Sequence, residues 1–308
     1  MQICKQNIRL ARTCSRGKSF FNTKDMIRIA IQSKGRLSED SLALMREAGI
    51  KIDELKRKFL ARAAGFPLEV LYLRDDDIPG VVESGSADLG IVGLNEVAET
   101  GADVVIVRKM GFGACRLSLA IPKEQEYTGP KFFEGKRIAT SYPNVLSGWL
   151  STNGVKAEIC KIMGSVEISP AAGIADAIFD IVSSGGTLVS NGLKEVETVL
   201  DSEAVLIARH NLDQEKQAIL DKMLFRFDAV MESGGKKYIL MNIPTDKVSE
   251  AVKILPAMRS PTVMPLAAEG WCSLHSVVLE SELWDKIERL KALGAEGILV
   301  LHLDKVID

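Results

Sequence analysis

Residues 164–188, GSVEISPAAGIADAIFDIVSSGGTL, place a short apolar run between acidic residues and a loop of small residues. The run 177–182 is mostly apolar and is bounded by Gly and Ser, which predicts a buried strand. Asp180 interrupts that run, and a carboxylate in a buried strand is costly unless it is paired or binds a ligand. We therefore expect Asp180 to have a specific role at the end of this strand.

The loop after the strand consists of Ser183, Ser184, Gly185, Gly186 and Thr187, and we call it the SSGGT loop. Its small residues can bring backbone N–H groups and hydroxyls close to an anion, and a following helix would add its dipole. Mg²⁺ takes one or two carboxylates together with substrate oxygens, which makes Asp180 and the upstream Glu167 candidate ligands. The pattern predicts a phosphosugar site with Mg²⁺; the alternative is an ordinary Gly-rich turn that binds nothing.

Composition limits the class of protein. A chain of 308 residues with 46% hydrophobic residues predicts two or three domains with their own cores. The net charge of −2 gives no indication of wholesale nucleic-acid or membrane binding, and no apolar run reaches transmembrane length. The five Cys are scattered without paired metal-ligand spacing, which indicates reduced thiols in a cytosolic protein. All three His lie in the last third, which excludes a His-based triad built from the first two thirds: His210, His275 and His302.

Residues 1–24 contain six basic residues and no acid. This composition is typical of a transit peptide. The alternative is a non-native or untranslated leader, because Met26 stands directly before the first expected strand. We favour the leader interpretation and predict that residues 1–25 are unstructured.

The next part of the chain alternates strands and helices, with strands expected at 27–31, 68–73, 88–92 and 104–107. Lys34, Gly35 and Arg36 lie in a polar loop after the first strand, and Ser38 is expected to cap a helix that ends at Gly49. Two cations beside a strand-to-helix junction favour an anion site, although loop cations are more often simply solvated.

Two further positions lie after strands. Arg74 precedes three consecutive Asp residues, which could bind a metal but more often form an exposed turn before a helix; Pro79 supports the helix start. Asn95 lies where a helix opens, and its ordinary role would be a cap.

We predict an α/β fold in which the chain crosses twice between two lobes with parallel strands, as in periplasmic-type binding proteins. Lobe I would contain residues 26–120 and 205–232, and lobe II residues 121–204, with the first crossing near Ala120. Tyr142 follows a lobe II strand and could stack on a base, although packing is the commoner role. This architecture by itself indicates no function.

Residues 233–308 predict a separate small domain after an amphipathic helix at 214–231. Strands at 238–243, 262–265, 272–279 and 297–302 alternate with helices at 246–255 and 281–293. This βαββαβ order is ferredoxin-like. The domain has no phosphate loop or acidic cluster of its own, so we expect it to serve regulation or assembly.

The SSGGT loop with Asp180 resembles the phosphoribosyl-pyrophosphate (PRPP) loop of phosphoribosyltransferases. The longer stretch is similar to one family, the long form of ATP phosphoribosyltransferase, which catalyses the first step of histidine biosynthesis. The resemblance runs from about Ile27 to the C-terminus and includes IAIQSKGRLSED, LRDDDIPG, SADLGIVGLNEV, GKRIATSYPN and SPTVMPLA. Together these motifs are far more specific than the loop alone.

The resemblance implies a Mg²⁺-dependent transfer of phosphoribose from PRPP to N1 of ATP, with release of pyrophosphate. The SSGGT loop would hold the 5′-phosphate, Asp180 the ribose hydroxyls, and Glu167 would lie with the ribose and Mg²⁺. The other positions match family motifs, with phosphate contacts expected at four of them and adenine contacts at two: Lys34, Gly35, Arg36 and Arg74, then Asn95 and Tyr142.

The resemblance also implies that the C-terminal domain binds histidine as a feedback inhibitor and that the chain forms a homo-oligomer, from dimer to hexamer. The local candidate is Ser260, Pro261 and Thr262; the alternative is that Pro261 merely begins an edge strand. Two other classes of protein fit the sequence less well. A solute-binding protein should have a secretory leader with an apolar core, which residues 1–24 lack, and an inactive regulatory paralogue should have lost the SSGGT loop.

Overall fold

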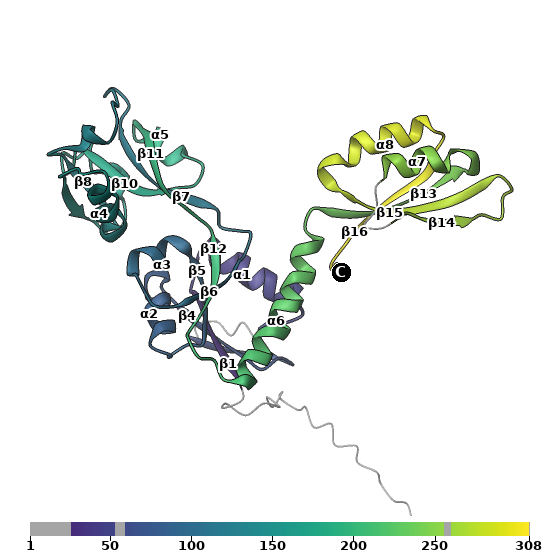
Figure 1. The fold of residues 1–308 in the computed structure, drawn as a ribbon, viewed down its shortest axis with the longest axis horizontal. Helices are drawn as coiled ribbons and strands as arrows, with labels where there is room; N and C mark the ends of the chain where they lie inside the picture. Colours follow the sequence, from purple (N-terminus) through teal and green to yellow (C-terminus); the bar gives the residue numbers. More distant parts are fainter. Residues whose placement is uncertain (1–25, 53–58, 256–259, 308) are drawn as a thin grey trace, which may run out of the picture.

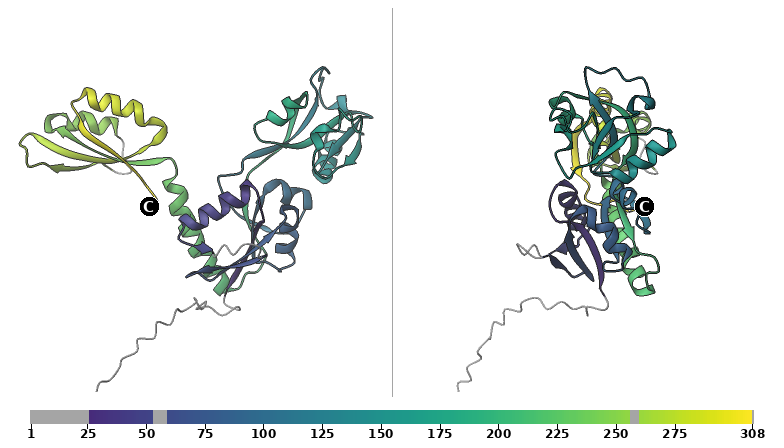
Figure 2. Two further views of the ribbon diagram at one scale, coloured as in Figure 1. Left: turned by 180° about the vertical axis from the view of Figure 1, so that it is seen from behind. Right: turned by 90° about the vertical axis from the view of Figure 1, so that its left-hand side faces the viewer.

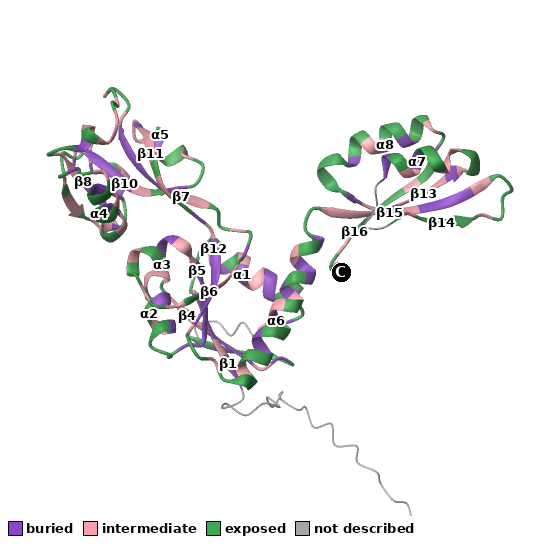
Figure 3. Cartoon of the chain, viewed as in Figure 1, coloured by how far each residue is buried: buried purple, intermediate pink, exposed green. Residues whose placement is uncertain are grey.

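The computed structural model describes residues 26–52, 59–255 and 260–307, which form three sheets of seven, five and four strands (Figure 1). We call the bodies built on these sheets lobe I, lobe II and the C-terminal domain, in that order. The predicted leader, residues 1–25, lies outside the described residues. Buried residues are concentrated in the strands at the centre of each body (Figure 3).

Lobe I contains a mixed sheet with the order β2-β3-β4-β1-β5-β12-β6. Strand β1 runs parallel to β4 and β5, whereas β12 runs antiparallel to β5 and β6. Its strands are β1 (Ile27–Gln32), β2 (Lys51–Ile52), β3 (Leu60–Ala64), β4 (Leu68–Leu73), β5 (Leu89–Gly93), β6 (Val105–Lys109) and β12 (Ala204–Ala208). Its helices are α1 (Arg36–Glu47), α2 (Ile78–Glu83), α3 (Leu94–Thr100) and α6 (Gln214–Ser233).

Both faces of the lobe I sheet are covered, which explains why its central strands are mostly apolar; the exceptions Arg28 of β1 and Glu69 of β4 form an ion pair with each other. Alternate residues of β1 enter different cores: Ile29 and Ile31 pack with side chains of α1 and α6, while Ala30 packs with Ile78 of α2. The period-2 alternation of a strand produces this division.

The start of α1 differs from the prediction. Gly35, not Ser38, is the N-cap, with φ 98°, and the helix begins at Arg36. Ser38 is buried inside the first turn. A glycine can take the positive φ that turns the chain directly from the β1 loop into the helix, so the helix starts earlier than the Ser signal indicates.

Lobe II contains the order β11-β7-β10-β8-β9. Strands β10, β8 and β9 are parallel, and β7 is antiparallel to both β10 and β11. The strands are β7 (Cys115–Pro122), β8 (Arg137–Thr140), β9 (Glu158–Lys161), β10 (Ala177–Val182) and β11 (Leu193–Ser202). The helices are α4 (Pro143–Thr152), α5 (Gly186–Ser190) and the 3-10 turn η4 (Val166–Ile168).

The chain crosses between the lobes twice, after β6 and after β11. The first crossing occupies residues 110–114, which is earlier than the predicted position near Ala120. Ala120 lies inside β7, whose Leu117 and Leu119 belong to the core of lobe II, so the whole strand belongs to that lobe. The prediction of parallel strands was also wrong in part, because the strands next to the crossings, β7 and β12, are antiparallel to their neighbours.

The C-terminal domain has the predicted ferredoxin-like order. Its sheet, β14-β15-β13-β16, is antiparallel in every pair, and both helices contribute to a single core. The helices lie on one side of the sheet (Figure 1). The elements are β13 (Lys236–Pro244), α7 (Val248–Ile254), β14 (Thr262–Pro265), β15 (Trp271–Leu279), α8 (Leu283–Ala292) and β16 (Glu296–His302).

Helix α6 joins lobe I to the C-terminal domain, as the left view in Figure 2 shows. The end of the chain then returns to this helix. The Val306 N–H donates to the Ala229 carbonyl at 2.8 Å, and the Ser233 hydroxyl donates to the Asp304 carbonyl at 3.0 Å. The C-terminal domain is therefore attached to α6 at both of its ends. Among the described residues, no helix combines the length and hydrophobicity needed to cross a membrane.

Candidate functional site

The SSGGT loop follows β10 directly, at the boundaries that the sequence predicts for the strand. Four of its five residues are exposed and Gly185 is half-buried. Gly185 has φ 79° and is the N-cap of α5, and its carbonyl accepts a hydrogen bond from the Val189 N–H at 3.1 Å. The loop is thus an accessible turn whose left-handed residue is a glycine, as a turn of this shape requires.

Asp180 is half-buried in β10, and its Oδ1 accepts a hydrogen bond from the Ile181 N–H at 2.8 Å. Burial, helped by the negative charge of Glu167, raises the pKa of Asp180 to about 6 against the lowering effect of the Ile181 hydrogen bond. Glu167 lies on η4, half-buried. The structure therefore brings the two predicted acids close enough to interact.

These two acids fit a metal that is held partly by substrate. Within the residues that the structure describes, no group of three or more His, Cys, Asp or Glu side chains is arranged to hold a metal. Mg²⁺ usually keeps one or two carboxylates and takes its other ligands from water and phosphate oxygens. A pair of neighbouring carboxylates beside an exposed loop meets that requirement.

Asn95 and Tyr142 come from different lobes and are in contact. The Asn95 amide donates to the Tyr142 hydroxyl oxygen at 3.2 Å and to Glu96 Oε1 at 2.8 Å, and the Tyr142 hydroxyl donates to the same Glu96 oxygen at 2.8 Å. Asn95 also accepts from the Ser202 hydroxyl at 2.8 Å. Asn95 and Tyr142 are both buried, so the predicted adenine residues form a polar contact between the lobes rather than an open stacking surface.

Glu96 is a residue that the sequence analysis missed. It is only 7% exposed. Burial raises its pKa to about 7; the Tyr142 hydrogen bond opposes this, and the charges of Asp75 and Asp76 add to it. The sequence does indicate this residue, because Glu96 is an acid within the apolar stretch that contains Asn95. Buried acids with raised pKa values cluster at functional sites.

A second contact between the lobes lies one turn further along α3. The Glu99 carboxylate accepts hydrogen bonds at 3.0 Å from the backbone N–H groups of Asn144 and Val145. These groups belong to the first turn of α4, whose unpaired N–H groups and dipole favour a carboxylate. Helix α3 of lobe I therefore caps a helix of lobe II.

The predicted phosphate-binding residues of lobe I surround the ends of β1 and β4. Lys34, Gly35 and Arg36 are exposed at the start of α1. Gln32, the last residue of β1, donates from Nε2 to Asp75 Oδ2 at 3.2 Å. Arg74 is exposed and paired with Asp76 through two hydrogen bonds of 2.9 Å. The three Asp residues form the predicted turn, a 3-10 turn directly before α2, in which Asp77 holds the N-cap position without a side-chain cap hydrogen bond.

The predicted site residues of lobe I and those of lobe II affect one another electrostatically. Burial raises the pKa of Tyr142, and the charges of Glu96 and of Asp180 contribute to this. Asp75 and Asp76 affect Glu96 in the same way. The charges of the turn after Arg74 therefore act on Glu96, and the charges of Glu96 and Asp180 act on Tyr142. These groups of the two lobes influence one another electrostatically.

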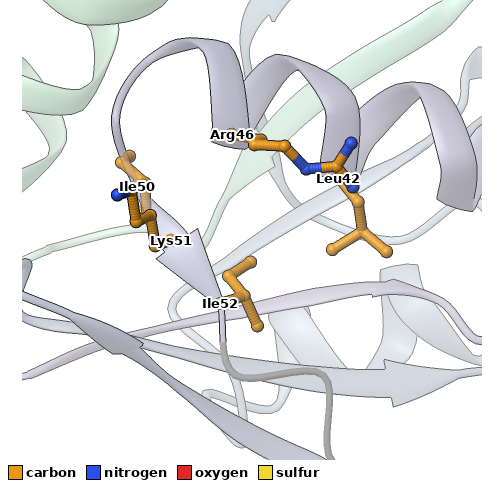
Figure 4. Close-up of a pocket in the computed structure, with 5 residues that line it drawn as sticks. All are labelled: Leu42, Arg46, Ile50, Lys51 and Ile52. Atoms are coloured by element: carbon orange, nitrogen blue, oxygen red, sulfur yellow. The ribbon is translucent and has the colours of Figure 1, made fainter.

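A separate pocket on lobe I contains none of the predicted site residues. It is lined by side chains from α1, β2 and the segment between them: Leu42, Arg46, Ile50, Lys51 and Ile52 (Figure 4). The predicted inhibitor residues also lie elsewhere, since Thr262 begins the edge strand β14 and Ser260 and Pro261 precede it. These residues do not belong to the site at the lobe boundary.

Comparison with known proteins identifies the family. Residues 74–229 match the family model HisG, ATP phosphoribosyltransferase, and residues 234–305 match the HisG C-terminal domain. The ATP phosphoribosyltransferase of Bacteroides fragilis is 57% identical over 282 residues, which is 92% of this chain and 100% of that protein. The chain belongs to the ATP phosphoribosyltransferase family.

Other members of the family give the same result. The ATP phosphoribosyltransferase of Bacteroides thetaiotaomicron is also 57% identical over 282 residues, 92% of this chain and all of that protein. Among solved structures, a chain of the ATP phosphoribosyltransferase (HisG:HisZ) complex of Thermotoga maritima matches with a TM-score of 0.58 and 27% identity, covering 66% of this chain and 98% of that one. The long-form resemblance and the enzyme class, a pentosyltransferase of histidine biosynthesis, are thereby confirmed.

Proposed function

We propose that this ATP phosphoribosyltransferase family member transfers phosphoribose from PRPP to N1 of ATP in the presence of Mg²⁺, releasing pyrophosphate. The observation that supports this most directly is the half-buried Asp180, three residues before the exposed SSGGT loop, whose charge acts on Tyr142 in the polar contact between the lobes. A phosphosugar needs an anion-binding loop for its phosphate and an acceptor for its hydroxyls. Both are present within eight residues of sequence.

The residues of the chain supply positioning and electrostatics. The ring nitrogen of ATP is itself the nucleophile, and the reacting ribose carbon develops oxocarbenium character, so little proton transfer is needed. The SSGGT loop would bind the 5′-phosphate and Asp180 would accept hydrogen bonds from the ribose hydroxyls. Lys34, Arg36 and Arg74 would face phosphates. Oriented binding and preorganised charge can supply most of such a rate enhancement.

Glu167 and Asp180 would hold Mg²⁺ together with substrate oxygens. When bound, the metal would neutralise charge on the departing diphosphate. Asn95 and Tyr142 would lie near the adenine. Tyr142 is 7% exposed and its hydroxyl is hydrogen-bonded to Glu96, so it offers no open ring face for stacking in this structure.

The direct test is to incubate the protein with ATP, PRPP and Mg²⁺ and to follow phosphoribosyl-ATP by absorbance and mass. Asp180→Asn keeps the side-chain volume, and we expect it to lose at least about tenfold in turnover or PRPP affinity. The matched control is Asp221→Asn, which changes an exposed aspartate on α6 and should leave the kinetics unchanged. Wild-type kinetics in a folded Asp180→Asn protein would contradict the assignment.

We also propose that histidine inhibits the enzyme by binding to the C-terminal domain, with Ser260, Pro261 and Thr262 as candidate contacts, and that the active species is a homo-oligomer. Support comes from the family match over residues 234–305 and from the separate core of this domain. An inhibitor that acts from a second site must bind one global state of the protein better than another.

A further inference from the structure

Arg116 is the second residue of β7, at the N-terminal end of this strand, and β7 pairs with the strand that precedes the SSGGT loop. In the register of the two strands, Arg116 is opposite Val182 and Ser118 is opposite Asp180. Because side chains alternate between the faces of a sheet, Arg116, Ser118 and Asp180 share one face. The end of β7 is therefore the immediate neighbour of the candidate PRPP site.

The guanidinium of Arg116 makes three hydrogen bonds. Nε and Nη2 donate to the two oxygens of Glu195 at 2.5 Å each, and Nη1 donates to the Ser183 carbonyl at 3.2 Å. No other side chain of the described residues donates to the backbone of Ser183 or Ser184. Arg116 is thus the side chain that fixes the first residue of the loop.

Glu195 is itself held by its neighbours. Its Oε1 accepts from the Ser118 hydroxyl at 2.7 Å and from the Thr198 hydroxyl at 3.2 Å. Strand β11 has a register shift between Glu195 and Glu197. Irregularities of this kind redirect side chains and are frequent beside active sites. The Glu195 carboxylate is therefore held in a fixed position from which it orients the Arg116 guanidinium.

The charge of Arg116 is balanced by Glu195, so the pair adds little net charge to the loop. The effect of the pair on the loop is therefore geometric and not one of net charge. A planar guanidinium can bind a carboxylate through two nitrogens and still donate from the third, which a lysine cannot do. Fixing the Ser183 carbonyl restricts the peptide that leads into Ser184 and Gly185, and hence the direction of the N–H groups that follow.

We propose that Arg116, oriented by Glu195, is a positioning residue that holds the SSGGT loop in its phosphate-binding conformation. The inference rests on the proposed function, because it assigns PRPP to this loop. It predicts an effect on PRPP and not on ATP, since Arg116 makes no described hydrogen bond to Asn95, Glu96 or Tyr142.

The same sheet offers a matched control. Arg137 of β8 forms an ion pair with Asp176 and donates from Nη1 to the Gly173 carbonyl at 3.1 Å. This pair has the same chemistry as Arg116 and Glu195, including a bond to a loop carbonyl. Gly173 and Asp176 precede β10, however, whereas the SSGGT loop follows that strand. Arg137→Met should therefore match Arg116→Met in stability but not in kinetics.

The experiment measures KM for PRPP and for ATP, and the melting temperature, in Arg116→Met and Arg137→Met. We expect KM for PRPP to rise about tenfold in Arg116→Met, as for one lost charge-assisted bond, with KM for ATP unchanged. Arg116→Lys should recover only part of the PRPP affinity. The double variant Arg116→Met/Glu195→Gln removes the unpaired carboxylate and should keep the PRPP defect.

Three results would overturn the inference. One is an equal change in both KM values, and another is an equal PRPP defect in Arg137→Met. The third is recovery of PRPP affinity in the double variant, which would show that the exposed charge of Glu195 caused the defect. If the wild-type protein itself converts no ATP and PRPP, the proposed function fails and the inference fails with it; the kinetic results above refute the inference alone.

Discussion

Replacing Glu96 by Gln should make the protein more stable at high pH. The structure buries this carboxyl between the lobes and raises its pKa from 4.5 to about 7. The folded state therefore binds more protons than the unfolded state between these values. The stability provided by protonated Glu96 is fully present below pH 4.5 and is lost as the pH rises through about 7.

The size of the effect follows from the two pKa values. A difference between 4.5 and about 7 corresponds to about 3 kcal/mol in the free energy of unfolding once Glu96 is ionised. Gln keeps an oxygen that can accept from Asn95 and Tyr142, and it never ionises. Glu96→Gln should thus exceed the wild type by less than about 1 kcal/mol near pH 5 and by up to about 3 kcal/mol at pH 8.

The assay is urea unfolding followed by circular dichroism at pH 5, 6, 7 and 8. Glu124→Gln, at an exposed glutamate, is the control and should follow the wild type at every pH. Tyr142→Phe is a second arm: the Tyr142 hydrogen bond lowers the pKa of Glu96, so its loss should shift the pH-dependent region upward. A difference between Glu96→Gln and the wild type that stays constant from pH 5 to 8 would refute the reasoning.

The remaining predictions concern the loop, a buried ion cluster and the C-terminal domain. A side chain at Gly186 would meet only the Ser184 hydroxyl, 3.7 Å from the added Cβ, so Gly186→Val should fold. The variant should raise KM for PRPP far more than KM for ATP. Equal changes in both KM values would show that the loop has only a structural role. Asp88 is buried and accepts hydrogen bonds from Lys216, Arg28 and Arg209. Burial alone would raise the pKa of Asp88, but these bonds outweigh it and lower the pKa. Asp88→Asn should therefore reduce the free energy of unfolding by roughly 3–5 kcal/mol at pH 7, measured by urea unfolding. This difference should shrink as the pH falls below about 3.8, where the wild type loses the same stability; a pH-independent loss would contradict the argument. Removing residues 234–308 should abolish inhibition by histidine, and an unchanged inhibition constant would place the regulatory site elsewhere.

Much of the fold could be predicted because its central strands are apolar runs with clear ends. Strands β4, β10 and β14 have the boundaries that the sequence predicts. Strand β11 was missed because two register shifts destroy the period-2 alternation that marks a half-buried strand. Helix α4 was missed as well, although Pro143 at its first turn is a common start signal.

The site was predictable where the chemistry is local and not where it depends on two lobes. The order of Asp180 and the SSGGT loop is visible in one stretch of sequence. The partners of Glu96 and Arg116 are not, because Tyr142, Ser183 and Glu195 lie 46, 67 and 79 residues away. Only the pairing of strands and the contact of α3 with α4 brings such groups together.

The attachment of the C-terminal domain to α6 at both ends has a mechanical consequence. A domain joined by a single linker can swivel without moving its neighbour. Here the chain leaves α6 after Ser233 and returns to Ala229 and Ser233 through the bonds of Val306 and Asp304. Rotation of the domain therefore applies torque to a 20-residue helix whose Met223 and Phe227 are packed in the core of lobe I. A continuous helix of this length would transmit a displacement of the C-terminal domain to lobe I as a change in the tilt of α6.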